Sequence, residues 1–453
     1  MSDWKVKRIK QLNKLFSLIL VVEVIIISGL AFTLKKLSKD RINPNDINDS
    51  KEDIVQTISS ESVLSEATDE PLEDTEPIYV SFTLVGDIMM HQWQIQRSYD
   101  AATDTFDVSD GFEYIKKYLC DADYTIGNLE TTMSGRYNGC MTDVLGYSGY
   151  PMFNAPEVLA DTLKDIGFDF LQTANNHCLD SGEQGIYTTI DTLDAAGLKH
   201  TGTFKSQEAN DELCIIDVNG ITFGFVAYTY DLNGMQYPQN ARYAINTLEM
   251  YSDSRLEELY AKVRALDEAG VDFVCPMIHF GTEYRATPDD WQEMVVDGLF
   301  ENGADIIYGG HPHVIEPMDI RTITNPDGST RTGYVFYALG DFISGSIYDY
   351  DSVDKDLGII ANLKFSKQVI NGEKTTRVEE ISIVPTHVYW TDETIGVVPV
   401  LEALDNRDEY SFLSAKNWER MEYSKEHVIE HLTSYGNLNY HLEKDRYIIE
   451  TKK

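Results

Sequence analysis

Basic residues are scarce in this chain of 453 residues. Its 37 lysines and arginines face 75 aspartates and glutamates, which gives a formal net charge of −38. Contacts to nucleic-acid phosphates need clustered Lys and Arg, so this charge excludes nucleic acid as a partner. It also argues against broad adhesion to an anionic membrane surface and indicates a solvated, acidic exterior.

Cysteines are also few, and their number is odd. The five are scattered through the chain and show neither paired metal-ligand spacing nor a dense disulfide framework. A bridge between Cys120 and Cys140 is conceivable in an exported domain, but free buried thiols are the favoured interpretation. The five are Cys120, Cys140, Cys178, Cys214 and Cys275.

Long apolar runs are absent except for one near the N-terminus. LFSLILVVEVIIISGLAFTL, residues 15–34, follows the basic stretch WKVKRIKQLNK and contains one acid, Glu23. Twenty helical residues cover about 30 Å, the thickness of a bilayer core. Because no convincing cleavage site follows, we predict an uncleaved signal-anchor helix rather than a signal peptide or a buried core helix.

The anchor predicts a single-pass protein of the cell membrane, with residues 1–14 cytoplasmic and the large domain extracytoplasmic. The bias of basic residues across the span is thin, with five before it and four soon after it. Residues 35–77 are predicted to form an acidic disordered tether, since eleven acids between residues 42 and 77 face only Lys51. A folded domain over residues 78–400 and a partly helical C-terminal tail over residues 401–453 complete the predicted organisation.

Short apolar runs alternate with amphipathic stretches from Ile78 onward. This alternation predicts an α/β fold with a layered β-sheet core and flanking helices. Asn219-Gly220 is a strong hairpin signal, so the sheet is expected to be mixed rather than purely parallel. The predicted strands cover 79–87, 124–130, 170–177, the two arms of the hairpin within 214–230, 271–281, 304–314 and 333–342, with extended segments over 356–385. The predicted helices cover 111–123, 156–169, 182–197, 254–270 and 289–303.

Polar side chains gather where the predicted strands end. Five segments carry them, and together these segments hold five of the ten histidines. A lone strand-end histidine is more often a structural residue than a ligand, but five at one sheet edge are not needed for stability. Sites in open α/β sheets lie at the carboxyl ends of strands. The segments contain Asp87 and His91; Asn128 and Glu130; Asn175, Asn176 and His177; His279; and His311 and His313.

This mixture of side chains predicts a metal site. Imidazole nitrogens, carboxylates and an amide oxygen suit Mn²⁺, Fe or Zn²⁺, whereas the absence of a thiolate among these strand-end residues argues against a structural zinc cluster. A carboxylate such as Glu130 could bridge two ions. Two such ions could together generate a hydroxide and clamp a phosphoryl oxygen.

Taken in order, the segments resemble the CapA family. Its members are poly-γ-glutamate capsule biosynthesis proteins whose domain is similar to calcineurin-like metallophosphatases. The matching pieces lie within residues 80–345 and include VGDIMMH, GNLETTMS, ANNHCLDSG, HFGTEY, YGGHPHVIEPM and YALGDF. The resemblance implies a metallophosphatase-like fold and two divalent metal ions.

The resemblance also implies roles for individual residues. Asp87 and His313 would bind the first metal, and Glu130 would bridge the two. Asn176, His279 and His311 would bind the second. His177 would then lie near the leaving group as a general acid or a stabiliser of the transition state.

Five further residues are candidates whose roles the sequence leaves open. His91 follows Asp87 by four residues, where phosphatases have a spacing of two. Asn128 precedes Glu130 by two residues, and Asp341 stands where the CapA pattern usually has asparagine. Glu283 and Tyr284 belong to the CapA pattern but not to phosphatases in general, so they would contact a CapA-specific substrate or form only a loop salt bridge and a packed ring.

Three functions remain open from the sequence. The first is a membrane-anchored extracytoplasmic protein that synthesises, exports or anchors an anionic capsule polymer such as poly-γ-glutamate, with capsule synthase subunits as partners. The second is a metal-dependent phosphoesterase acting on a cell-surface phosphate ester. The third is a non-catalytic assembly subunit that keeps the metal cleft as a scaffold. Binding an acidic polymer directly would require metals or local basic residues to offset the negative charge.

Overall fold

The computed structural model describes residues 74–249, 252–346 and 353–451. The predicted cytoplasmic segment, the predicted membrane span and the tether up to residue 73 lie outside these ranges. Within the ranges, no helix is both long enough and apolar enough to cross a bilayer.

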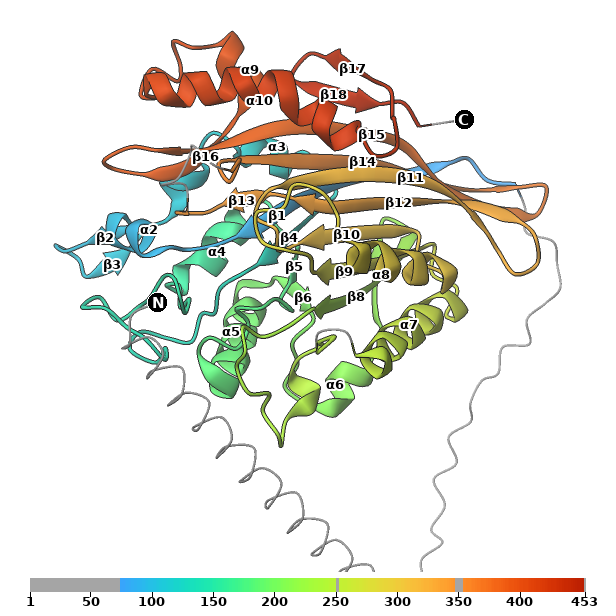
Figure 1. Cartoon of the computed structure of the whole chain (residues 1–453), viewed down its shortest axis with the longest axis horizontal. Helices are drawn as coiled ribbons and strands as arrows, with labels where there is room; N and C mark the ends of the chain where they lie inside the picture. The colour runs from blue at the N-terminus through green and yellow to red at the C-terminus, as the bar shows by residue number, and fades with distance from the viewer. Residues whose placement is uncertain (1–73, 250–251, 347–352, 452–453) are drawn as a thin grey trace, which may run out of the picture. The chain divides into compact units, whose positions relative to one another are not determined.

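Two mixed β-sheets form the centre of the domain (Figure 1). The larger has ten strands in the order β17-β18-β15-β14-β1-β4-β5-β6, and β13 and β16 pair with β1 and β15. The bounds of its strands are β1 Ile78–Ile88, β4 Tyr124–Leu129, β5 Phe170–Gln172, β6 Lys199–Thr201, β13 Asp341–Ile343, β14 Leu357–Ile370, β15 Glu373–Trp390, β16 Ile395–Pro399, β17 Tyr440–Glu443 and β18 Arg446–Ile449.

The smaller sheet has six strands in the order β11-β12-β10-β9-β8-β7. The predicted hairpin at Asn219-Gly220 joins its edge strand β7 to β8, and Asn219 has a φ of 52°. The bounds of its strands are β7 Cys214–Val218, β8 Ile221–Thr229, β9 Phe273–His279, β10 Ile306–Gly310, β11 Ile315–Thr324 and β12 Thr330–Leu339. A separate short ribbon pairs β2 Tyr99–Asp100 with β3 Thr105–Phe106.

The sheets pack face to face over an aromatic core. In β1, Val80, Phe82 and Leu84 alternate with the residues of the opposite face and belong to this core. The ring of Phe82 lies 4.2 Å from that of Phe223 on the facing sheet, measured between centroids. The other face of β1 carries Val85 and Ile88, which pack in a different cluster with the flanking helices.

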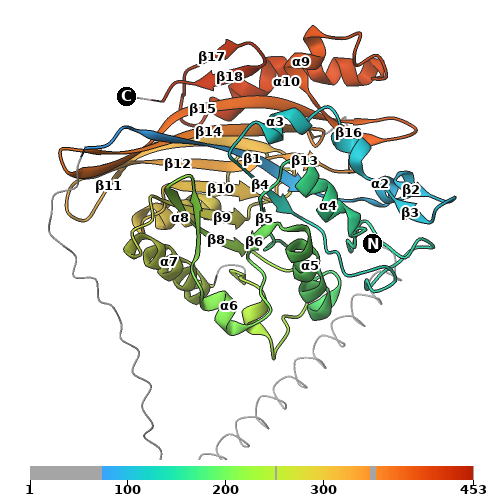
Figure 2. The same cartoon turned by 180° about the vertical axis from the view of Figure 1, so that it is seen from behind.

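Helices cover the two outer faces, which produces four layers (Figure 2). Helices α3, α4 and α5 contribute to the cluster beside the larger sheet, and α7 and α8 contribute to the one beside the smaller sheet. Helix α5 ends at Gly197 with a φ of 74°, as its C-terminal glycine predicts. The bounds of the helices before residue 302 are α2 Gln92–Arg97, α3 Lys116–Cys120, α4 Val158–Asp165, α5 Gly182–Ala196, α6 Gln207–Asp211, α7 Asp253–Glu268 and α8 Asp290–Glu301, with short 3₁₀ turns at Ser109–Phe112 and Arg242–Ala244.

The residues after 400 extend and cover the larger sheet, and one of their helices also lies against β11 of the smaller one. Helices α9 (Val400–Asp405) and α10 (Ala415–Thr433) supply the expected helical part. Strands β17 and β18 were not expected, because each is only four residues long, which is too short for a clear alternation of polar and apolar side chains. Strand β18 pairs with β15, and α10 lies against β11 and β15.

The mixed α/β architecture predicted from the sequence is confirmed. Strands β1, β4 and β5 run parallel in one sheet, and β8, β9 and β10 run parallel in the other. Asp87 is in register with Asn128 on β4 and with Asp341 on β13. His279 is in register with Gly310 on β10, so pairing alone brings distant motifs to one edge of each sheet.

Candidate metal centre

Two acids form the floor of the site. Asp87 and Glu130 are 1% and 0% exposed. The carboxylate of Asp87 accepts hydrogen bonds from the Asn128 amide at 2.7 Å and from the backbone N–H of His311 at 3.2 Å. Neither carboxylate oxygen of Glu130 has a hydrogen-bond partner among the described residues. An unpartnered buried carboxylate is costly, so Glu130 is a candidate ligand for a cation.

His279, at the end of β9, contacts residues that follow or end strands of the larger sheet. Its Nε2 is 2.8 Å from the amide oxygen of Asn176 and 3.4 Å from Oε1 of Glu130. Its Nδ1 lies 3.3 Å from the Asn128 amide. His279 is fully buried, and burial lowers its pKa to about 4. It is therefore a neutral imidazole, the form that binds metals.

His311 and His313 come from the loop that follows β10. Both have a backbone in the left-handed region, with φ of 105° and 58°. Positive φ values are uncommon for residues other than glycine, and strained ones cluster at functional sites. The turn directs both rings inward: His311 packs 4.9 Å from the His279 ring, and its buried Nδ1 has no hydrogen-bond partner among the described residues.

His313 contacts three acids. Its Nδ1 is 2.9 Å from Oδ1 of Asp341 and 3.5 Å from Oδ2 of Asp87, and its Nε2 is 4.0 Å from Oε1 of Glu130. Burial alone would lower the pKa of His313, but Asp341 and Glu130 outweigh it and hold the pKa well above its usual range. Burial and the nearby charge of Asp87 raise the pKa of Glu130 well above its usual range. Asp87, Glu130 and Asp341 carry more potential negative charge than His313 can balance. A divalent cation bound here would offset it.

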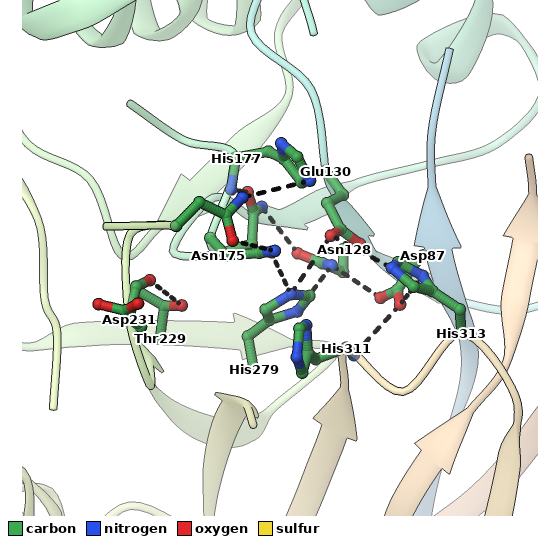
Figure 3. A network of polar contacts seen from close by, with 12 residues as sticks. Asp87, Asn128, Glu130, Asn175, His177, Thr229, Asp231, His279, His311 and His313 are labelled. Atoms are coloured by element: carbon green, nitrogen blue, oxygen red, sulfur yellow. Dashed lines mark hydrogen bonds and ion pairs between the residues drawn. The ribbon is translucent and has the colours of Figure 1, made fainter. Parts of the chain in front are cut away.

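These side chains point toward one another (Figure 3), and their potential ligand atoms form three overlapping sets. In each set, one atom per residue lies within 4.8 Å of the others. Glu130, Asp87 and His313 each belong to two sets, so one carboxylate can face two positions. The sets are Glu130, His311 and His313; Asp87, His313 and Asp341; and Asp87, Glu130 and His279.

His177 lies beside this centre and is held by a carboxylate. Its Nδ1 is 2.7 Å from Oδ2 of Asp180, which also accepts the backbone N–H of Phe153. Its Nε2 is 3.5 Å from the amide of Asn233. The Asp180 contact fixes the ring and leaves Nε2 as the nitrogen available for proton transfer, the arrangement that general acid catalysis requires.

Three asparagines hold the centre together. Asn128 donates to Asp87, and its amide oxygen accepts from Asn175 at 3.1 Å. Asn175 also donates to the backbone carbonyl of Leu129. The oxygen of Asn128 therefore points toward Asn175, which makes Asn128 a positioning residue, whereas Asn176 presents its oxygen to His279.

The remaining candidates lie in different places. His91 accepts at its Nδ1 from the backbone N–H of Gly345 and belongs to none of the sets of ligand atoms. Asp341 is fully buried and belongs to one of them. Tyr284 lies at the rim, with its ring 6.0 Å from that of His313, and Glu283 is exposed beside it.

Three site residues were missed in the sequence. Asp180 and Asn233 lie in loops whose folding the local pattern does not reveal. Tyr230 directly follows β8, and its ring lies 4.5 Å from that of His311. The strand-end rule that found the histidines would have found Tyr230 if it had been applied to β8.

All five cysteines are unpaired in the structure. Cys120 and Cys140 are exposed and do not bridge, whereas Cys178 and Cys275 are buried. None belongs to a set of metal-ligand atoms in the described part of the chain.

Comparison with known proteins assigns the family. The chain is 28% identical over 280 residues to the capsule biosynthesis protein CapA of Bacillus anthracis, covering 60% of this chain and 62% of that protein. It is 28% identical over 265 residues to the PGA biosynthesis protein CapA of Bacillus subtilis (strain 168), covering 58% and 63%. The chain thus matches less than two thirds of the length of either relative.

A solved structure of a hypothetical protein from Thermus thermophilus aligns with 70% of this chain and 97% of its own at 12% identity. Its TM-score of 0.33 is too low to support any inference. The family model described as bacterial capsule synthesis protein PGA_cap matches residues 81–346, more than half of the chain. The chain therefore belongs to the PGA_cap family of bacterial capsule synthesis proteins.

Proposed function

We propose that the protein is a divalent-metal-dependent hydrolase that cleaves a phosphate ester in the synthesis, export or anchoring of an anionic capsule polymer. The observation that carries this proposal is Glu130. Its carboxylate is fully buried beside His279 and His313, and both of its oxygens lack a hydrogen-bond partner among the described residues.

The residues present fit two divalent ions. Carboxylates, imidazoles and an amide oxygen are the ligands expected of Mn²⁺, Fe or Zn²⁺. Asp87 and Glu130 are the carboxylates that belong to two ligand sets each, so either of them could be shared between two ions. The residues that would hold the ions are Asp87, Glu130, Asn176, His279, His311 and His313, with Asp341 as a further ligand or as the partner of His313.

Metal ions in this place would supply Lewis-acid stabilisation of charge on a phosphoryl oxygen. Residues of the chain itself would supply proton transfer and contacts to the substrate. His177 can hold a proton at Nε2 and deliver it to a leaving oxygen, while Asp180 keeps the ring oriented through Nδ1. Tyr284 and Glu283 stand at the rim, where the organic part of a substrate would lie.

The cellular setting is also part of the proposal. Residues 15–34 would anchor the protein in the cell membrane, and residues 35–77 would hold the domain away from the outer surface. Capsule synthase subunits are the partners that this placement favours. Bound metal ions would offset part of the negative charge that otherwise repels an anionic polymer.

An assay of wild type and His313→Ala tests the proposed chemistry. We expect the wild type to hydrolyse bis(p-nitrophenyl) phosphate when Mn²⁺ or Zn²⁺ is supplied, and we expect a chelator or His313→Ala to abolish this activity. A wild type that binds metal but hydrolyses neither this diester nor p-nitrophenyl phosphate would favour a scaffold without catalysis.

A further inference from the structure

The loop that follows β8 reaches the candidate metal centre from the smaller sheet. It carries Asn233, an exposed residue with a φ of 52°, and the preceding Leu232 is only 3% exposed. Leu232 belongs to the same apolar cluster as Cys178, which directly follows His177 in the chain. The loop is therefore anchored against the segment that carries His177.

Asn233 holds one end of a candidate metal ligand. The amide of Asn176 is fully buried, and its oxygen lies 2.8 Å from Nε2 of His279. Its NH₂ group donates to the amide oxygen of Asn233 at 3.1 Å. An asparagine amide has an acceptor at one end and donors at the other, so the bond to Asn233 turns the oxygen of Asn176 toward the centre. Turned the other way, the same amide would aim N–H groups at a bound cation.

The other end of the Asn233 amide faces His177. Its Nδ2 lies 3.5 Å from Nε2 of His177, and a separation this long makes a weak bond. The neighbours nevertheless fix the roles of both groups. Because Asn176 bonds to the oxygen of Asn233, the NH₂ group is the end that faces His177, and Nε2 accepts. Nδ1 of His177 then carries the proton and donates to the carboxylate of Asp180 at 2.7 Å.

These contacts form a chain of hydrogen bonds that runs in one direction. Asn176 donates to Asn233, and Asn233 donates to His177. His177 in turn donates to Asp180. Hydrogen bonds arranged in this way polarise and strengthen one another. The chain joins a candidate ligand of the metal to the residue that would transfer a proton, and Asn233 lies between the two.

We propose that Asn233 is a positioning residue of the metal centre. Through its oxygen it orients the ligand Asn176, and through its NH₂ group it holds Nε2 of His177 as an acceptor. The bond to Nε2 is weak, so it sets the role of that nitrogen without blocking it. That these contacts serve hydrolysis rests on the proposed function, whereas the orientation of the two side chains does not.

Two substitutions separate the two ends of the amide. Asn233→Gly removes both contacts, and glycine keeps the left-handed backbone of the loop without strain. Asn233→Asp keeps an oxygen for Asn176 but offers no donor to His177. We expect Asn233→Gly to lower the affinity of the full-length protein for Mn²⁺ or Zn²⁺ by about 10–100-fold, the loss typical of a partner outside the ligand shell. Asn233→Asp should restore this affinity, but kcat for bis(p-nitrophenyl) phosphate should stay about tenfold below wild type, the equivalent of one hydrogen bond.

A measurement on the metal-free protein reads the orientation itself. The probe is ¹⁵N NMR of histidine-labelled full-length protein, with His177→Gln to assign the signals. We expect the wild-type ring of His177 to carry its proton at Nδ1. Asn233→Gly should shift the Nε2 resonance, because that nitrogen loses its donor.

Asn219→Gly is the matched control. Asn219 is exposed, has the same φ of 52° and precedes β8, whereas Asn233 follows that strand at its other end. The control should leave the metal affinity, kcat and the signals of His177 unchanged. Any general effect of replacing a left-handed asparagine by glycine would instead appear in both variants.

The readouts distinguish this proposal from the proposed function. A wild type that binds metal but hydrolyses no phosphate ester would contradict the proposed chemistry alone, because metal affinity and the NMR signals still decide the role of Asn233. In a wild type that binds no metal, the NMR signals alone decide it. The proposal is overturned if Asn233→Gly leaves the signals of His177 unchanged, if it binds metal as tightly as wild type, or if Asn233→Asp loses as much metal affinity as Asn233→Gly.

Discussion

Oε1 of Glu130 lies 3.4 Å from Nε2 of His279, and the two residues reach each other from different β-sheets. Glu130 follows β4 of the larger sheet, and His279 ends β9 of the smaller one. The site is thus built where the carboxyl ends of two parallel strand sets meet. A cation held here would join the two halves of the domain.

Glu130→Gln should remove most of the metal affinity. Loss of a partner outside the ligand shell costs about 10–100-fold in metal affinity, and loss of a bridging ligand should cost more. Titration of the metal-free protein with Mn²⁺ or Zn²⁺ measures the change. Glu316→Gln is the matched control, because Glu316 is equally buried but belongs to no ligand set. Equal affinity of Glu130→Gln and wild type would remove Glu130 from the centre.

Asp341→Asn should weaken metal binding, whereas His91→Ala should not. Asp341 holds Nδ1 of His313 at 2.9 Å, and loss of such a partner typically costs about 10–100-fold in affinity. His91 is instead bonded to the backbone of Gly345. Metal titration of both variants checks the difference. A loss of affinity in His91→Ala equal to that in Asp341→Asn would place His91 among the ligands.

Asp180→Asn should separate catalysis from metal binding. Asp180 contacts His177 and the backbone of Phe153, and it belongs to no set of ligand atoms. We expect phosphodiester hydrolysis to fall by about 10²-fold or more, since a misoriented histidine loses its acid–base role. Metal content should stay at the wild-type level. Unchanged hydrolysis would show that His177 does not need this carboxylate.

Glu316 should make stability depend on pH. Burial raises its pKa to about 8, despite a hydrogen bond from Gln292. Between about pH 5 and 8 the unfolded chain ionises Glu316 while the folded protein keeps the proton, so rising pH favours unfolding by up to about 1.4 kcal/mol per pH unit. Gln at this position does not titrate, so Glu316→Gln should gain in melting temperature over wild type as pH rises from about 5 to 8. Melting curves of both metal-free proteins measure this gain, and a constant difference across the range would refute it.

The strands and site residues that could be predicted from the sequence were those that depend on the local pattern of apolar residues and on the pairing of neighbouring strands. Asp87 and Glu130 stand at or directly after the ends of two paired parallel strands, so pairing alone predicts that they approach each other, whereas the approach of His279 depends on how the two sheets pack. Asp341 stayed ambiguous because its pairing with Asp87 joins residues far apart in the chain. The short strands β17 and β18 carry too few residues for a clear alternation.

The packing of α10 could not be predicted for a different reason. Tyr423 and His427 form a stacked pair that a helical pattern allows, but their position beside the His313 loop depends on how α10 packs on β11. That packing is fixed by contacts between distant residues, such as the bond from His431 to Ile315. A single sequence carries no direct signal for such contacts.

Metal content of the purified full-length protein tests the central claim most directly. After reconstitution with Mn²⁺, Fe²⁺ or Zn²⁺ and removal of excess metal, elemental analysis should find about two tightly held ions per chain, as expected for a two-metal hydrolase. His313→Ala should lose at least one of them. A correctly folded wild type that retains none of these metals would contradict the account.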